Sequence, residues 1–269
     1  MRQFNRSKCK FIKEKWGLFF LIILLFAAFA GGTVYAKKAD VVKTIKEIAP
    51  GLLEGYLAPE MLPNSLKLLP PPPAADSSAF TVDKTVSEQS LTLRETPRWQ
   101  QAIKDANPHF PEAIDSYAAI VDIPITEENT PHLYMLLRRT LTDFGLSTYT
   151  AKTEYNRSRP FVMNNEPVCT PEDEEKLRKD GSYPSGHTTI GWGWALLFCE
   201  LFPEQTDVLL KRGWEFGQSR VICNVHWQSD VNQGRIMGAA TFARLHADPG
   251  FLADIEAAKA EIAAFEKGK

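Results

Sequence analysis

Three short clusters in the second half of the chain carry residue types that could bind and transform an oxyanion. The first cluster spans residues 152–160 and contains Lys152 and Arg159, which are seven positions apart. That separation is about two turns of an α-helix, so both cations could reach one side of a helix. Alone, such a pair is typical of solvated surface charges. Its meaning depends on the other two clusters.

The second cluster is Gly-Ser-Tyr-Pro-Ser-Gly-His-Thr at residues 181–188, directly before an apolar run. Glycine, serine and proline interrupt regular structure, so this sequence predicts a helix that begins near Ser185, Gly186 and His187. The free N–H groups and the dipole at a helix N-terminus favour a bound anion. Gly186 would let an oxyanion approach the backbone closely. The plainer interpretation is an ordinary helix cap.

The third cluster is Ser-Arg-Val-Ile-Cys-Asn-Val-His-Trp-Gln-Ser-Asp at residues 219–230. His226 and Asp230 are four positions apart, which makes them neighbours on a helical face. A carboxylate there could hold the imidazole in one tautomer and leave its other nitrogen free. Arg220 adds a third candidate cation just upstream. By itself, a His–Asp pair more often makes a structural hydrogen bond than a catalytic one.

Together the clusters predict a site for a phosphate-like oxyanion. Several positive donors can stabilise the equatorial oxygens of a phosphoryl group during its transfer. One imidazole could attack phosphorus while the second protonates the leaving oxygen. His187, His226 and Asp230 could instead form a metal site with two histidines and one carboxylate. Three converging cations would repel a divalent cation, so we expect no metal and no other cofactor.

Helical periodicity dominates from Pro97 onward, and convincing runs of alternating strand pattern are absent. Thr130 and Pro131 are a typical cap and first-turn pair, followed by a buried face at Leu133, Leu136, Leu137, Leu141 and Phe144. Further helices are expected over residues 172–179, 188–202, 207–219 and 227–246, and in a last helix from Asp248 and Pro249 that buries Phe251, Leu252, Ile255 and Ile262. The sequence predicts an all-α fold, a single compact domain of packed helices.

Three further features qualify this fold prediction. Residues 37–62 have the pattern of a mixed, partly helical segment. The four prolines at residues 70–73 cannot be helical and favour polyproline II, either as a rigid linker or as a strap across the domain. Gly191 and Gly193 lie inside a predicted helix and would let a second helix pack closely against it.

The start of the chain is typical of a secretory signal peptide. Residues 1–15 carry six Lys and Arg against one acid, and the strongly apolar residues 16–32 follow. Val34 and Ala36 then provide small residues for cleavage after residue 36. An uncleaved membrane anchor is the alternative. Both interpretations export residues 37–269, predicted to be the functional helical domain, to the periplasm or the medium.

Composition and cysteine content narrow the remaining possibilities. The formal net charge of −2 argues against broad nucleic-acid binding, and 44% hydrophobic residues are enough for a core. The longest apolar run after the leader, about residues 191–202, is shorter than the roughly 20 residues that span a membrane, so we expect no stable membrane insertion. Beyond the leader, Cys169, Cys199 and Cys223 allow one disulfide and one free thiol, and three pairings stay open.

The three clusters also resemble a known signature. Lys-x6-Arg-Pro, Pro-Ser-Gly-His and Ser-Arg-x5-His-x3-Asp occur here in the order typical of the phosphatidic acid phosphatase type 2 and vanadium haloperoxidase superfamily. Residues 181–188, the Leu-Pro-Pro-Pro-Pro-Ala-Ala-Asp-Ser at residues 69–77 and the Ser-Arg-Val-Ile-Cys at residues 219–223 resemble the bacterial class A non-specific acid phosphatases. The likeness covers almost all of the chain after the leader.

The resemblance implies a helical, metal-independent domain, often a periplasmic homodimer, that hydrolyses phosphate monoesters of broad specificity. It implies that His226 is the nucleophile and forms a phosphohistidine, that Asp230 orients it, and that His187 is the general acid. Activity is then expected near or below the ordinary histidine pKa of about 6.5. The residues implied to bind phosphate are Lys152, Arg159, Ser185, Gly186 and Arg220.

The chain departs from the family pattern at Asn224 and Val225, where relatives usually carry glycine and then a small or aromatic residue. Asparagine tolerates a left-handed backbone better than most residues, so we expect the turn to survive. Substrate preference next to His226 is what this departure leaves open.

Three other functions fit parts of the pattern. A vanadate-dependent haloperoxidase would use the same oxyanion cradle. A lipid phosphate phosphatase would need further membrane-spanning segments, which the chain after the leader lacks. An exported phosphate-binding protein would need the cations, but not His187 together with the spaced His226 and Asp230. The natural substrate and any phosphotransferase activity stay open.

Overall fold

The computed structural model describes residues 45–268, of which Lys46 onward form one compact unit. The predicted signal peptide therefore lies outside the described residues. The described part is mostly helical, as the periodicity predicts. None of its helices combines the length and the apolar content that crossing a membrane requires.

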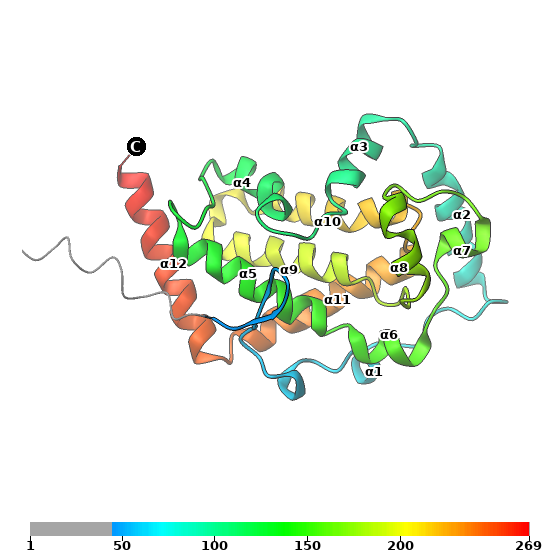
Figure 1. Cartoon of the computed structure of the whole chain (residues 1–269), viewed down its shortest axis with the longest axis horizontal. Coiled ribbons are helices and arrows are strands. Elements are labelled where there is room, and N and C mark those ends of the chain that lie inside the picture. Colours follow the sequence, from blue (N-terminus) through cyan, green and yellow to red (C-terminus); the bar gives the residue numbers. More distant parts are fainter. Residues whose placement is uncertain (1–44, 269) are drawn as a thin grey trace, which may run out of the picture. The chain divides into compact units, whose positions relative to one another are not determined.

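Five long helices build the core. In Figure 1, α9 lies between α10 and α11, α5 packs against α9, and α12 crosses one end of the group. Gly191 and Gly193 permit the close packing that the sequence predicts, because a Cβ there would overlap the rings of Phe216 and Phe144. The bounds are α5 Pro131–Leu146, α9 Gly186–Leu201, α10 Thr206–Ile222, α11 Gln228–Leu245 and α12 Pro249–Lys267.

The shorter helices flank this core, and several gather at the end where α9 begins (Figure 1). The α-helices among them are α1 Ser65–Leu68, α2 Ser78–Leu91, α3 Pro97–Lys104, α4 Asp115–Val121, α6 Tyr149–Tyr155, α7 Pro160–Asn164 and α8 Glu174–Arg178. Single 3-10 turns are η2 Pro59–Met61, η3 Glu112–Ile114, η4 Pro171–Asp173 and η5 Pro203–Gln205.

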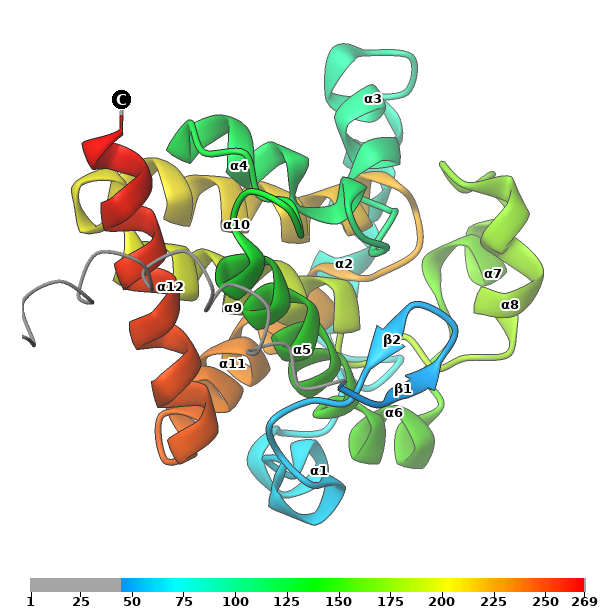
Figure 2. The ribbon, with the colours of Figure 1, turned by 60° about the vertical axis from the view of Figure 1, so that its left-hand side comes forward.

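Residues 45–62 are the described part of the segment predicted to be mixed and partly helical, and they contain a small antiparallel hairpin of β1 Glu47–Ala49 and β2 Leu52–Leu53, followed by η2. Figure 2 shows this hairpin beside α5. The buried carboxylate of Asp143 on α5 accepts hydrogen bonds from the N–H groups of Tyr56 and Leu57, each at 2.9 Å. These long-range bonds fix the segment, and no local pattern in the sequence reveals them.

Two other predictions meet different outcomes. The prolines at residues 70–73 form a strap rather than a free linker, because the hydroxyl of Tyr183 donates to the Pro70 carbonyl at 2.6 Å and Leu69 packs with Tyr183 and Met237. On α12, Phe251, Ile255 and Ile262 are buried as predicted, whereas Leu252 is exposed. Leu252 follows Phe251 by about 100° around the helix, which turns it away from the core.

Among the cysteines of residues 45–268, one disulfide joins Cys169 to Cys223, and Cys199 is free. The bridge selects one of the three pairings that the sequence leaves open. It ties the segment before α8 to the turn after α10, which carries His226.

Candidate active site

The predicted site residues meet at one end of the core. Helices α9, α10 and α11 follow one another in antiparallel order, so the start of α9, the end of α10 and the start of α11 lie together (Figure 1). The junction between α6 and α7 lies at the same end. All three sequence clusters are therefore brought to one place.

Lys152 and Arg159 do not share a helix, which corrects the first expectation. Helix α6 ends at Tyr155, and Asn156 turns the chain with a left-handed φ of 36°. Arg159 occupies the N-cap position of α7, and its side chain makes no capping hydrogen bond. The two side chains meet on the second cluster instead: the Gly181 carbonyl accepts from Lys152 Nζ at 2.6 Å and from Arg159 Nη2 at 3.3 Å.

Asp180 completes this pairing, although the sequence did not single it out. Its Oδ2 lies 2.9 Å from Arg159 Nη2 and 3.5 Å from Lys152 Nζ. Burial, and then the charge of Arg159, lower the pKa of Lys152 to about 8. The sequence signal for Asp180 is weak, because a single acid before a Gly-Ser turn is usually a surface residue.

His226 lies outside any helix, which corrects the prediction that it shares a helical face with Asp230. Helix α11 begins at Gln228, so His226 precedes its cap and Asp230 lies in its first turn. Asp230 Oδ2 accepts from the N–H of Trp227 at 2.8 Å and lies 3.3 Å from His226 Nδ1. The His–Asp contact survives because the carboxylate reaches back past the helix start.

The contacts of His226 define its tautomer. Arg159 Nη1 lies 3.1 Å from Nε2, and a guanidinium only donates, so Nε2 is the acceptor. Nδ1 therefore carries the proton and donates to Asp230. Burial, and then the charges of Arg159 and Lys152, hold the pKa of His226 well below its ordinary value. His226 is therefore a neutral imidazole whose Nε2 lone pair lies among cations.

The start of α9 offers a small set of donors. The N–H of Ser185 donates to the Asp230 carbonyl at 3.0 Å, and its Oγ accepts from the Thr188 hydroxyl at 2.9 Å. The Ser185 hydroxyl can still donate its own hydrogen. The N–H groups of Gly186 and His187 have no carbonyl one turn back within the helix. These three donors fit the predicted anion site, with Ser185 contributing through its side chain.

His187 is oriented from the loop after α3. Its Nε2 lies 3.0 Å from the carbonyl oxygen of Ala106, so Nε2 carries a hydrogen and donates it. Nδ1 is the other ring nitrogen, which this hydrogen bond does not use. Burial, and then the charge of Arg220, hold the pKa of His187 well below its ordinary value. His226 contributes in the same direction, so the two imidazoles influence one another electrostatically.

Arg220 is the most unusual group at this end of the core. Its side chain is fully buried, yet Nε and Nη1 have no hydrogen-bond partner in residues 45–268. Burial, and then the nearby charge of Arg159, lower its pKa to about 10. Arg212 also leaves Nε and Nη1 without partners but pairs with Asp105, whereas Arg220 makes no ion pair within residues 45–268, so its donors are available to an anion.

The turn between α10 and α11 tolerates the departure from the family pattern. Asn224 has a φ of 61°, the left-handed conformation expected of it. Its side-chain amide also donates to the Glu166 carbonyl at 2.9 Å, which ties the turn to the segment after α7. The prediction that this turn survives with asparagine is confirmed.

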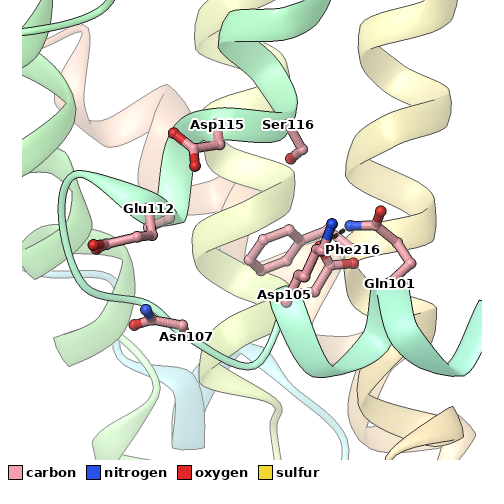
Figure 3. A pocket seen from close by; sticks show the side chains of 9 residues that line it. Gln101, Asp105, Asn107, Glu112, Asp115, Ser116 and Phe216 are labelled. Carbon is pink, nitrogen blue, oxygen red and sulfur yellow. Dashed lines mark hydrogen bonds between the residues drawn. The ribbon is translucent and has the colours of Figure 1, made fainter.

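A cavity of about 460 Å³ lies beside the loop that holds His187, between α3, η3 and α4 (Figure 3). Figure 3 shows Asp105 and Asn107, which flank Ala106, on its wall. None of the predicted site residues lines it. The cavity is linked to the candidate site through the backbone of this loop and through Asp105, whose carboxylate accepts from the hydroxyl of Ser219, the neighbour of Arg220.

Comparison with known proteins identifies the family of the chain. The model of the PAP2 superfamily matches residues 131–251, which contain all three clusters. A non-specific acid phosphatase of Providencia stuartii is 44% identical over 213 residues, covering 79% of this chain and 86% of that protein. A second, from Salmonella typhimurium, is 43% identical over 211 residues, covering 78% and 84%. The chain belongs to the non-specific acid phosphatases of the PAP2 superfamily.

A solved structure with a weaker likeness was also found. A bacterial vanadium-dependent iodoperoxidase matches with a TM-score of 0.48 and 19% identity, covering 76% of this chain and 62% of that chain. A likeness this weak carries no argument about chemistry. Membership of the non-specific acid phosphatases rests on the sequence relatives.

Proposed function

We propose that this protein is an exported acid phosphatase that hydrolyses phosphate monoesters of broad specificity through a phosphohistidine, without a metal ion. The observation that carries the proposal is Arg220, whose buried Nε and Nη1 lack partners in the part of the chain that the structure describes and lie near Lys152, Arg159 and His226. A phosphate group supplies the missing acceptors and offsets the excess positive charge. A binding protein would need those cations, but not a nucleophilic nitrogen among them.

In the first step, His226 Nε2 attacks phosphorus in line as the bond to the leaving oxygen breaks. Asp230 accepts the Nδ1–H hydrogen bond and stabilises the positive charge that the ring gains. His187 gives a proton to the leaving oxygen, so an alcohol departs. Because Nε2 is already the unprotonated nitrogen, no proton has to leave His226 before attack.

In the second step, water attacks the phosphohistidine and the nitrogen–phosphorus bond breaks. His187, now neutral, takes a proton from that water, and inorganic phosphate leaves. His226 recovers its lone pair on Nε2. Charge on the three nonbridging oxygens is offset throughout by the side chains of Lys152, Arg159 and Arg220 and by the donors at the start of α9.

Export and assembly are parts of the proposal with different support. A disulfide between Cys169 and Cys223 fits an oxidising compartment such as the periplasm or the medium. The homodimer and the cleaved leader remain predictions from the sequence. Small phosphate monoesters are the proposed partners, and no nucleic acid is expected.

The proposal is tested on the purified protein with p-nitrophenyl phosphate at pH 5–7, with and without a chelator. We expect hydrolysis that persists with the chelator, because the cations perform the work of a metal. Strict dependence on an added divalent ion would overturn metal independence. Bromide oxidation with vanadate and peroxide but no hydrolysis would favour a haloperoxidase, and phosphate binding without turnover would favour a binding protein.

The dependence of rate on pH follows from His187 and Lys152. In the free enzyme, the pKa of His187 lies below its ordinary value, so the ring is neutral near pH 6.5 and does not start protonated there. A bound phosphate dianion raises that pKa by opposing the charge of Arg220. We therefore expect kcat/KM to fall as pH rises through this lowered pKa, before pH 6.5 is reached, and the fall in kcat to come at higher pH. Lys152 loses its charge as pH rises through about 8, which weakens binding further.

Measuring kcat and kcat/KM between pH 4 and pH 9 checks this expectation. The separation between the two profiles reports how far the substrate raises the pKa of His187. Rates that still climb at pH 9 would contradict the assignment of His187 as the general acid.

A further inference from the structure

Arg157 lies behind the proposed nucleophile and joins two buried carboxylates. Its Nη1 donates to Asp230 Oδ1 at 2.6 Å, and its Nη2 donates to Asp83 Oδ2 at 2.8 Å. The side chains of Arg157, Asp230 and Asp83 are 8%, 0% and 3% exposed. The oxygen that Arg157 holds on Asp230 is the one that does not face His226. The chain of contacts therefore runs from α2 through Arg157 and Asp230 to His226.

The surroundings of Arg157 fix its position from several sides. Asp83 also accepts from the N–H of Ser229 at 2.8 Å and from its hydroxyl at 2.5 Å. The Ser229 hydroxyl is in turn 2.7 Å from Arg157 Nη1. The rings of Phe80 and Trp227 each lie 5.6 Å from the guanidinium. Such a planar cation, bonded at both ends and close to two aromatic rings, has little freedom to move.

The charged groups around Asp230 show which of them favours its ionised form. Burial raises the pKa of Asp230, and Arg157 is the first of the groups that oppose this. The ionisable groups that face Asp230 from the elements around it are Arg157 after α6, Lys152 on α6, Arg159 before α7, Tyr183 before α9 and His226 before α11, with Asp83 of α2 behind Arg157. Among the arginines and lysines of the described residues, Arg157 is the one that forms an ion pair with Asp230.

Substrate binding sharpens the contrast between these cations. The proposed phosphate site uses Lys152, Arg159 and Arg220, so a bound phosphate dianion offsets their charge. Arg157 is already committed to Asp83 and Asp230 on the side away from that site. During the reaction it is therefore the cation left to favour the ionised form of Asp230.

We propose that Arg157 is a positioning residue, anchored by Asp83, that keeps Asp230 ionised and aligned so that His226 presents Nε2 to phosphorus at acid pH. The inference rests on the proposed function. A protonated Asp230 could no longer accept the Nδ1–H of His226, and the nucleophilic tautomer would lose its support. An enzyme that works in acid is the most affected, because low pH favours the protonated form of Asp230.

The test compares Arg157→Met with the wild type in kcat, KM and inhibition by inorganic phosphate from pH 4 to pH 8. Loss of an arginine beside a carboxylate raises the carboxyl pKa by about one to three units. We expect the acid limb of kcat to move to higher pH by a similar amount, with little change in the phosphate inhibition constant. Arg157→Lys should restore part of the lost range, because it keeps the charge without the two-sided fork.

Arg94→Met is the matched control, since Arg94 forms a half-exposed pair with Glu166 and also lies near an aromatic ring, Trp99. It should leave the pH profile unchanged. If Arg157→Met does not fold, Asp83→Asn carries the test, because it removes the anchor and should shift the acid limb in the same direction by less.

Two results separate the possible failures. A folded Arg157→Met enzyme with an unmoved acid limb, or with a uniform loss at every pH, overturns the positioning role and leaves the proposed function standing. A wild-type protein that forms no phosphoenzyme and hydrolyses no monoester overturns the proposed function itself.

Discussion

Replacing His226 with alanine is expected to abolish phosphoenzyme formation and to lower kcat by roughly four to six orders of magnitude. The reason is that Nε2 is the nucleophilic nitrogen presented among Lys152 and Arg159, with its lone pair defined by the Arg159 contact. Rapid acid-free quenching of the wild type with labelled substrate should trap a label that is stable in alkali and lost in acid. Peptide mapping should place it on His226.

The matched control is His132→Ala, a partly exposed histidine in the first turn of α5. It should keep both the label and the rate. An acid-labile label that persists at normal amounts in folded His226→Ala protein would refute the assignment of the nucleophile. Residual hydrolysis without a label is compatible with it, because the cations still polarise a bound ester.

The three clusters could be assigned to one site from the sequence because their cations, imidazoles and predicted helix start together suit a phosphate group, and because their order resembles the superfamily signature. What spacing could not predict was how they meet. Lys152 and Arg159 look like a helical pair, yet a left-handed Asn156 separates them and the Gly181 carbonyl brings them together. A chain turn of this kind depends on contacts far along the sequence.

His226 and Asp230 show the same limit from the other direction. Their spacing of four predicts a shared helical face, but the chain turns at Asn224 and α11 starts only at Gln228. The available signal was an acid three residues after Trp227, the position from which a side chain caps the helix start. That signal competes with helical periodicity, and a single sequence does not decide between them.

Arg157 was missed although it stands inside the first cluster. Its partner Asp83 lies 74 positions away, and nothing in the local pattern separates it from the solvated charges nearby. Helix α2 itself has a weak apolar pattern, with Asp83, Ser87 and Ser90 among its buried residues. Buried polar networks of this type emerge from tertiary packing, which is why periodicity predicts the helices better than it predicts the support behind His226.

Replacing Arg220 with methionine is expected to stabilise the unliganded protein while lowering kcat/KM by roughly three orders of magnitude or more. The buried Nε and Nη1 lack partners in residues 45–268, and unpaired buried donors cost about 1–3 kcal/mol each. Methionine fills similar space without that cost, so the melting temperature should rise. The same change removes a cation from the phosphoryl oxygens. Thermal melting and steady-state kinetics measure the two effects.

Added phosphate separates this explanation from a purely structural one. Phosphate at 100 times its dissociation constant should stabilise the wild type by about 2.7 kcal/mol, and much less stabilisation is expected for Arg220→Met. Arg212→Met is the contrast, because Arg212 is similarly buried and also leaves Nε and Nη1 without partners among the described residues, but its Nη2 pairs with Asp105. Its loss should lower the melting temperature by leaving a buried carboxylate unpaired. If Arg220→Met also melts earlier and still gains full stability from phosphate, Arg220 is part of the scaffold and its idle donors are not the phosphate site.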